Sequence, residues 1–358
     1  MIMNKEDLAL DEMIREISTA PEIYKPSAFW EKLGDVNKEQ LQRRGYGDFK
    51  RTVNQNYYNW LTVEWNCPQF KNVRRLWWKH KSLRPLFLQF KNSRNTELSS
   101  GIHPLSTWKG RLNYKLFVGL LWEYARWKDP EKLLDKLEEP FLGNSLDIRR
   151  GNQQISQDLA NSVLERNVIM QHVDCADKKT MTVAELGAGY GRLAYVFLKT
   201  TSCRYFIFDI PPALGLSQWY LSKLFPERRI FRFRHFQDFS EIREELAQCD
   251  IAFFTPNQLE MFPDDYVDIF ATVSSLHEMR MDQIKNYITL MERISQTFLF
   301  IKQWNDMRNE ENNITVRRED YILSEEWNIL EDHLGSVQDL FFTLLAKKQK
   351  RGLADVLQ

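Results

Sequence analysis

The chain has 358 residues, 43% of them hydrophobic, which is enough to bury one large core or two of ordinary size. Its formal net charge is zero, which removes any global electrostatic argument for binding nucleic acid or a membrane surface. The four cysteines form no C-x-x-C pair and no run of about 18 apolar residues occurs, so we predict reduced thiols, no zinc site, no transmembrane helix and a cytoplasmic location.

Residues 1–148 are predicted to form a helical N-terminal region that covers the substrate. Aromatic or aliphatic residues recur three and four positions apart in residues 8–17, 49–65, 70–90 and 111–127. Between Glu64 and Glu97, basic residues accumulate among tryptophans and phenylalanines without any acidic residue. This stretch is either a platform for an anionic substrate, such as an acidic sugar, or a helix with inward tryptophans and solvated lysines. The helical spacing of the aromatic residues favours the second interpretation.

The second predicted region, residues 149–358, opens with a helix from Gly151 to Val173. Its polar residues Gln157, Asp158 and Asn161 fall on adjacent turns. They either line the mouth of the binding site or form a solvated helix face, and the sequence does not favour one of these readings. The first reading makes them substrate-binding residues, together with Arg192 farther along the chain.

Residues 181–212 carry the most informative pattern, which is a strand, a turn with three glycines, a helix and a second strand that ends at Asp209. This order is typical of half of a nucleotide-binding βαβ unit, in which the acidic residue accepts hydrogen bonds from ribose hydroxyls. A dinucleotide fingerprint has its third glycine inside the helix, where this chain has Arg192, so an NAD-dependent oxidoreductase is disfavoured. The turn instead resembles motif I of class I S-adenosyl-L-methionine (SAM) methyltransferases. SAM is therefore the expected cofactor, and its expected binding residues here are Glu185, Gly187, Ala188, Gly189, Gly191 and Asp209.

Two later strands supply further cofactor candidates. Asn257 and Gln258 directly follow a predicted strand at residues 251–256 and are candidates for the adenine contact, with Asp238 after the preceding strand as a rival. The predicted strand from Tyr266 to Ser274 is expected beside the first strand, so its carboxyl end, including Ser274, faces the cofactor.

His277 is the candidate catalytic base, because it is the histidine that falls at the ligand side of a predicted central strand. Methyl transfer to a hydroxyl requires removal of the hydroxyl proton, and a neutral imidazole can accept it. Glu278, Asp264 or Asp265 are candidates to orient the ring, and Glu278 is also the rival base. The alternative is a histidine that caps the next helix or is satisfied in the core.

The predicted fold class is α/β, with a Rossmann-like class I methyltransferase sheet of seven mostly parallel strands and the last strand antiparallel. Helices are expected at residues 239–248 and 282–295, capped by Ser240 and Asp282 respectively. Residues 305–320 are polar and predict an exposed loop or lid. The last strand is expected near residues 339–347, and residues 325–330 are either its partner strand or a short helix.

Several segments extend the resemblance, running in order from about residue 27 to 304: SAFWEKLG, ELGAGYGRLAY, FDIPPAL, FFTPNQL, SSLHEM and FIKQW. Together they resemble the sugar O-methyltransferase family of bacterial polysaccharide gene clusters. The resemblance implies a role in polysaccharide biosynthesis and a carbohydrate acceptor, which is free, nucleotide-linked or part of a glycan. It also assigns Glu185, Gly187, Gly189 and Asp209 to the cofactor and His277 to the acceptor.

Two alternatives remain open at this stage. The same cofactor site would serve methylation of another small hydroxyl or amine compound, since only the acceptor pocket would differ. A non-catalytic SAM-fold subunit that binds a glycan or a partner protein is disfavoured by the intact glycine turn and Asp209. No metal is expected, because no dense carboxylate cluster occurs, and no nucleic-acid partner is expected. The sequence leaves the oligomeric state open.

Overall fold

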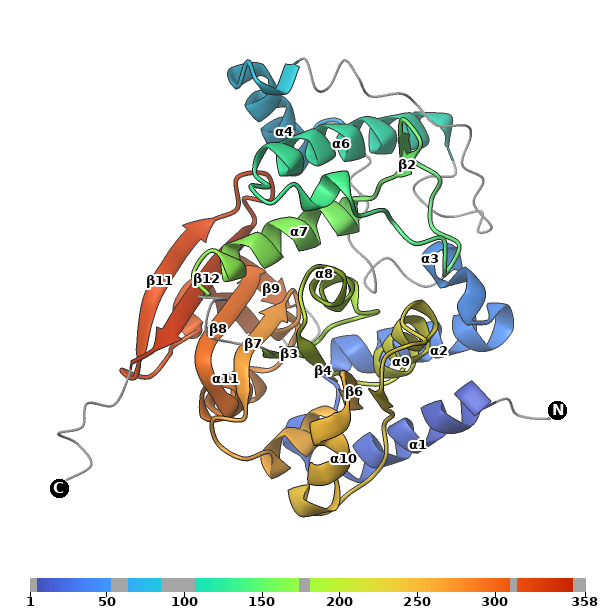
Figure 1. The fold of residues 1–358 in the computed structure, drawn as a ribbon, viewed down its shortest axis with the longest axis vertical. Helices are drawn as coiled ribbons and strands as arrows, with labels where there is room; N and C mark the ends of the chain where they lie inside the picture. The colour runs from blue at the N-terminus through green and yellow to red at the C-terminus, as the bar shows by residue number, and fades with distance from the viewer. Residues whose placement is uncertain (1–4, 53–63, 85–106, 174–180, 310–313, 350–358) are drawn as a thin grey trace.

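The protein is built around one eight-stranded sheet (Figure 1). The computed structural model describes residues 5–52, 64–84, 107–173, 181–309 and 314–349. The strand order is β11-β12-β8-β7-β3-β4-β6-β5. In chain order the strands are β3 (Thr182–Leu186), β4 (Arg204–Phe208), β5 (Ile230–Phe231), β6 (Ile251–Phe254), β7 (Val267–Val273), β8 (Ser295–Trp304), β11 (Trp327–Leu334) and β12 (Phe341–Lys348).

Six neighbouring strands, from β5 to β8 across the sheet, run parallel, while β12 runs antiparallel to both β8 and β11. The central strands β3 and β6 are buried along their whole length, as expected for parallel strands covered by helices on both faces. The prediction of a mostly parallel α/β sheet with an antiparallel last strand is therefore confirmed. Strand β7 pairs with β3, so the predicted neighbour relation of these strands is confirmed as well.

Helices cover the two faces of the sheet and form a hydrophobic core on each side. On one face lie α7 (Gln157–Met170), α8 (Arg192–Thr200) and α9 (Ala213–Leu224). On the other lie α10 (Arg243–Gln248) and α11 (Met281–Ile294). The carboxyl ends of β3, β4, β6 and β7 meet at one edge, where ligands bind in open parallel sheets.

The N-terminal helices are α1 (Lys5–Thr19), α2 (Ala28–Arg44), α3 (Phe49–Thr52), α4 (Pro68–Lys79) and α6 (Trp108–Trp127). Their buried residues Met13, Leu41 and Trp122 belong to the same hydrophobic cluster as Val183 and Ile207 of the sheet. Where the structure describes it, the N-terminal region is thus helical, as predicted, and shares a core with the sheet. Residues 53–63 and 85–90 of the predicted helices lie outside the described residues, and the boundary between residues 148 and 149 stays a prediction.

Several predictions of secondary structure were wrong. The sheet has eight strands rather than seven, because residues 327–334 form strand β11 beside β12, where the sequence had left a partner strand or a short helix open for residues 325–330. Residues 305–320 contain an antiparallel hairpin of β9 (Asp306–Asn309) and β10 (Ile314–Arg317) rather than only a loop. Residues 149–154 form a small hairpin of β1 (Arg149–Arg150) and β2 (Gln153–Gln154), and α7 begins only after Ser156, whose hydroxyl accepts from Leu159 N.

Two predicted helix caps are displaced. Asp238, not Ser240, caps the short helix at residues 239–241, with Glu241 completing a capping box. Arg280 precedes α11, so Asp282 lies within its first turn, where a carboxylate interacts favourably with the helix dipole. Helix α2 was not predicted, because its mixed sequence shows only weak helical periodicity.

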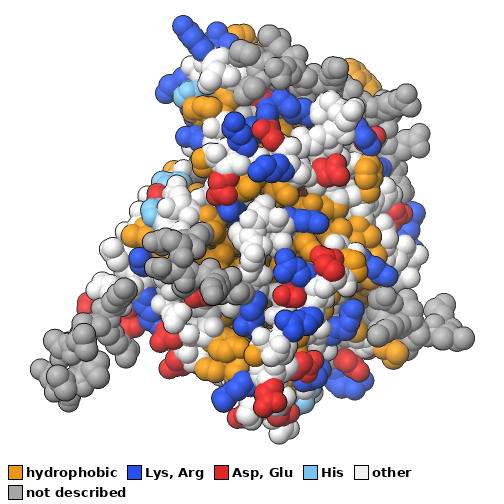
Figure 2. Space-filling view, in the orientation of Figure 1, with side chains coloured by type: hydrophobic (Ala, Val, Ile, Leu, Met, Phe, Trp, Pro, Cys, Tyr) orange, Lys and Arg blue, Asp and Glu red, His pale blue; other side chains and the backbone are white. Residues whose placement is uncertain are grey.

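Basic and acidic side chains are interspersed across the face of the molecule shown in Figure 2. This mixture agrees with the zero net charge of the sequence. Among the described helices, none combines the length and the apolar character needed to cross a membrane.

Candidate active site

The glycine turn joins β3 to α8 at the carboxyl edge of the sheet. Gly187, Gly189 and Gly191 all have positive φ angles, of 74°, 58° and 89°. A Cβ atom on Gly187 would lie 2.1 Å from Ser275 Oγ, so this glycine lets the turn pack against the segment that follows β7. The turn and the end of β7 are therefore held in direct contact.

Asp209 is fixed to this turn from the end of β4. Its Oδ2 accepts a hydrogen bond from Gly189 N at 2.8 Å, and its Oδ1 accepts one from Ile210 N at 2.7 Å. Burial raises the pKa of the carboxyl to about 7, against the lowering effect of these two hydrogen bonds. The carboxyl is thus held rigidly at the mouth of the turn and titrates near neutral pH.

A small cavity of about 60 Å³ lies over the turn and Asp209. It brings together five residues predicted for the cofactor or for catalysis, which are Gly187, Gly189, Asp209, Ser274 and Glu278. The remaining walls are largely apolar and come from Trp30, Leu186, Ile210, Ala213, Pro256, Ser275, Met279 and Tyr287. Trp30 belongs to α2, so the N-terminal region closes one side of the cavity.

Glu278 is the carboxyl that faces this cavity opposite Asp209. Its Oε2 accepts a hydrogen bond from Trp30 Nε1 at 2.8 Å, and its backbone oxygen accepts one from Ser27 Oγ at 2.8 Å. Burial raises the pKa of Glu278 to about 8, and the nearby Asp209 carboxylate adds to the increase. Two contacts from the N-terminal region therefore hold the segment after β7 in place.

His277 is buried, with 1% of its surface exposed, and is not among the residues that line the cavity. Its Nδ1 lies 2.8 Å from Gln303 Oε1, which also accepts from Ser275 N at 3.0 Å. A carbonyl oxygen can only accept, so Nδ1 carries the proton and Nε2 is left as an acceptor, 3.7 Å from Glu278 Oε1. Burial lowers the pKa of His277 to about 4, so the ring is neutral at pH 7.

The residue that orients His277 is therefore Gln303, which was not predicted. Asp264 forms an ion pair with Arg293, and Asp265 forms one with Lys348, so neither carboxylate is the predicted partner of the imidazole. The backbone pairing of β7 with β8 brings Gln303 under the residues after β7. The sequence alone gives no signal for this long-range contact.

The adenine candidates lie close to the cavity in sequence but do not line it. Gln258 accepts from Thr255 N and donates to Arg234 O, so its amide caps the turn that follows β6. Asn257 donates to Glu16 Oε1 at 2.8 Å, and Asp238 is a helix cap. Pro256 is the residue of this segment that lines the cavity, and the adenine assignments stay predictions.

Glu185 and Ala188 are also buried away from the cavity lining. Glu185 Oε2 accepts a hydrogen bond from Tyr205 OH at 2.7 Å, and burial raises the pKa of this carboxyl to about 7. Gly191 precedes α8, where a Cβ atom would meet Leu221 at 2.9 Å. These three residues lie outside the cavity lining, and their contact with a cofactor stays a prediction.

The predicted substrate residues divide among three further cavities. Gln157 and Arg192 line a small cavity that also includes Ser274, and Asn161 lines a much larger one beside it. Asp158 accepts from Tyr190 OH at 2.7 Å and lines a separate cavity, and burial raises its pKa to about 6.

An ion-pair cluster separates the small cavity from the large one. Arg192 Nη1 lies 2.7 Å from Glu165 Oε2, and Lys302 Nζ lies 2.8 Å from Glu165 Oε1. Burial alone would raise the pKa of Glu165, but the two cations outweigh it and lower the pKa. Arg192 was predicted, whereas Glu165 of α7 and Lys302 of β8 were not.

The described residues contain no group of three or more His, Cys, Asp or Glu side chains placed to hold a metal ion.

No protein-family model and no curated protein matches the chain, so membership of the sugar O-methyltransferase family stays a prediction. Solved structures match about half of the chain. A SAM-dependent methyltransferase from Aquifex aeolicus shares 15% identity over 51% of this chain and 89% of its own, with a TM-score of 0.30. The 1,6-didemethyltoxoflavin-N1-methyltransferase of Burkholderia thailandensis was solved with S-adenosylhomocysteine. It shares 12% identity over 54% of this chain and 79% of its own, with a TM-score of 0.36.

Magnesium protoporphyrin IX methyltransferase from Synechocystis PCC 6803, solved with SAM, shares 13% identity over 54% of this chain and 83% of its own, with a TM-score of 0.36. The chain is thus similar to SAM-dependent methyltransferases over about half of its length, at values that carry no conclusion about its substrate.

Proposed function

We propose that the protein is a SAM-dependent methyltransferase that transfers a methyl group to a hydroxyl of a sugar or glycan. The observation that supports this most is the bond between Gly189 N and Asp209 Oδ2, which ties the glycine turn to the acidic end of the next strand. This pairing presents a carboxylate and a close backbone approach at the same cavity, as a ribose-bearing ligand requires.

The residues around the cavity fit SAM chemically. Asp209 would accept hydrogen bonds from the ribose hydroxyls, and the apolar wall of Ile210, Pro256 and Tyr287 would suit an adenine ring. When bound, SAM supplies a methyl group on a sulfonium, which is already an excellent leaving group. The chain itself must therefore align the acceptor and remove its proton.

Glu278 and His277 together could handle this proton. Glu278 lines the cavity and would take the proton from the acceptor hydroxyl when it is ionised. His277 Nε2, held as an acceptor by Gln303 on the other side of the ring, lies 3.7 Å from Glu278 Oε1. This exceeds a hydrogen bond, so Nε2 would accept the proton of the Glu278 carboxyl only after the two side chains move closer. We therefore assign Glu278 as the base and His277 as the residue that supports it.

The sugar as acceptor is supported by the sequence resemblance of residues 27–304, and another small hydroxyl or amine compound would use the same cofactor site. A non-catalytic SAM-fold subunit is the second candidate, since a cavity of about 60 Å³ is well below the roughly 300 Å³ of the smallest ligand pockets. In the proposed enzyme, α2 or the Trp30 side chain moves outward when the cofactor binds.

Calorimetric titration with SAM tests the proposal. The wild-type protein is expected to bind SAM, and Gly189→Arg is expected to abolish binding because the side chain would fill the cavity. Gly151→Arg is the matched control, since Gly151 also has a positive φ but has no atom within 4 Å of its Cβ position. Absence of SAM binding by the wild type, or unchanged binding by Gly189→Arg, would refute the proposed site. Labelled SAM with a panel of sugars and nucleotide sugars then tests transfer.

A further inference from the structure

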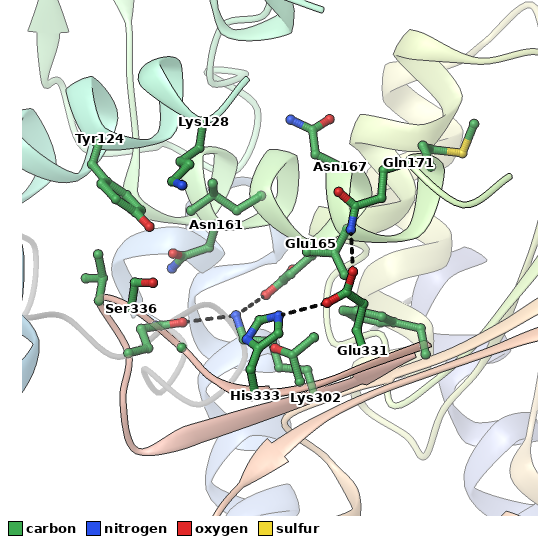
Figure 3. Close-up of a pocket in the computed structure, with 18 of the residues that line it drawn as sticks. Tyr124, Lys128, Asn161, Glu165, Asn167, Gln171, Lys302, Glu331, His333 and Ser336 are labelled. Atoms are coloured by element: carbon green, nitrogen blue, oxygen red, sulfur yellow. Dashed lines mark hydrogen bonds and ion pairs between the residues drawn. The ribbon is translucent and has the colours of Figure 1, made fainter. Parts of the chain in front are cut away.

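A cavity of about 690 Å³ lies between α7 and the β8–β12–β11 end of the sheet. Figure 3 shows it with Tyr124 of α6, Lys128 directly after α6 and Asn161 of α7 above it. Lys302 of β8 and His333 of β11 lie below, and the turn between β11 and β12 forms one wall. Its volume falls within the range of small-molecule sites, roughly 300–1,000 Å³.

Asn161 presents an unsatisfied donor to this cavity. Its side chain is 3% exposed, and its Nδ2 has no hydrogen-bond partner among the residues that the structure describes. Leaving a buried amide donor unpaired costs about 1–3 kcal/mol, so such a group is retained where a ligand or water completes it. The amide points into the cavity in Figure 3.

The cavity combines polar groups with apolar surface in a way that suits a polyhydroxylated ring. Asn161, Asn167, Gln338 and Thr343 offer hydrogen bonds, while Leu164, Val168 and Phe300 offer apolar contacts. A sugar ring has hydroxyls around its edge and C–H groups on its faces, so it needs both kinds of neighbour. A wholly apolar ligand would leave the buried Asn161 amide without a partner.

The charges that line the cavity leave one cation available. All three carboxylates are engaged by other side chains: Glu165 by Arg192 and Lys302, Glu131 by Arg166, and Glu331 by Gln171 and His172. Lys128, at the rim, lies over the Trp127 ring and forms no ion pair with any residue in the described ranges. An anionic group on the ligand would complete this site.

The large cavity adjoins the small one, which in turn adjoins the cavity of Asp209. Glu165, Lys302 and Gln338 line both the large cavity and the small one, and Ser274 lines both the small cavity and that of Asp209. The three cavities thus lie one after another toward the glycine turn, with the Glu165 ion pairs between the first two.

We propose that this cavity binds a glycosyl unit bearing an acidic group, with Asn161 bonded to a ring hydroxyl and Lys128 facing the acid. This inference rests on the proposed function, because it makes the cavity the acceptor-specificity site of the same enzyme.

Saturation-transfer NMR on the full chain tests it, with glucuronate, glucose and glucosamine as the probes. These sugars share one ring and differ in charge, so glucuronate should bind best and glucosamine least. Asn161→Leu should weaken glucuronate and glucose binding by about two- to tenfold, the value of one hydrogen bond. Lys128→Gln should reduce glucuronate to the level of glucose. Asn328→Leu, the same change at an exposed position of β11, is the matched control.

The outcomes separate the two proposals when the same samples are titrated with SAM. If SAM binds but no sugar does, or if Asn161→Leu and Lys128→Gln bind glucuronate like the wild type, the acidic-sugar site is refuted while the methyltransferase proposal stands. If glucuronate binds with the expected variant pattern and SAM does not, the cavity assignment holds and the methyltransferase proposal falls. Preferential binding of glucose over glucuronate would overturn the acidic-group part.

Discussion

If SAM binds at the proposed site, Asp209 should make its affinity depend on pH by an amount that can be calculated. Its pKa is raised to about 7 by burial, so the carboxyl is largely protonated at pH 6 and largely ionised at pH 8. Each oxygen already accepts one backbone N–H, and ribose hydroxyls need the lone pairs that only the ionised form leaves available. SAM binding should therefore strengthen as pH rises through 7.

The magnitude follows from the ionised fraction. With a pKa near 7, the fraction is about one eleventh at pH 6 and about ten elevenths at pH 8, so the apparent Kd should fall about tenfold, or about 1.4 kcal/mol. Calorimetry at pH 6, 7 and 8 measures this change. Asp209→Asn is the control, because it should bind more weakly at pH 8 and lose the Asp209 share of the pH dependence.

The titration of SAM itself is shared by the wild type and Asp209→Asn and cancels in the comparison. The titration of Glu278 does not cancel, because the Asp209 carboxylate contributes to its pKa of about 8, so both proteins are also compared with Glu278→Gln added. The reasoning would be refuted if the Kd of the wild type did not change between pH 6 and 8. It would equally be refuted if Asp209→Asn showed the same pH dependence as the wild type.

Three further predictions concern neighbouring residues. Glu278→Gln should lower kcat by about 10²- to 10⁴-fold with little change in the Kd for SAM, and a larger loss in His277→Ala would move the base role to the imidazole. Trp30→Ala should tighten SAM binding in calorimetry, since it opens the cavity and frees Glu278; weaker binding would mean that the indole contacts the cofactor. Replacing Arg74 and Arg75 with Glu should raise KM for an anionic acceptor in initial-rate assays, and an unchanged KM would assign α4 to packing alone.

The sequence predicted the turn and the strand that carries Asp209 because their signals are local. Three glycines, two apolar strands and an acidic residue lie within 30 consecutive residues, about the length of one βαβ unit. The end of β7 was also predicted, since a strand with this apolar density has only a few places in a parallel sheet.

The rest of the cavity depends on contacts between distant segments. Trp30 reaches Glu278 from a helix that was not predicted, and Gln303 reaches His277 across the β7–β8 pairing. A sequence pattern places a residue at a strand end but does not say to which side its ring turns. His277 was expected to contact the ligand, but the side chain that lines the cavity is that of the next residue, Glu278.

The closure of the cofactor cavity by α2 has a consequence for how the protein can be divided. A fragment that starts at residue 149 would keep Gly189, Asp209 and Glu278 but would lose the indole that covers them, together with the apolar partners of the sheet. Trp30 would then no longer restrict the access of SAM to the proposed site, and the exposed apolar core would favour aggregation. The N-terminal helices thus form part of the proposed cofactor site and are not a separate module.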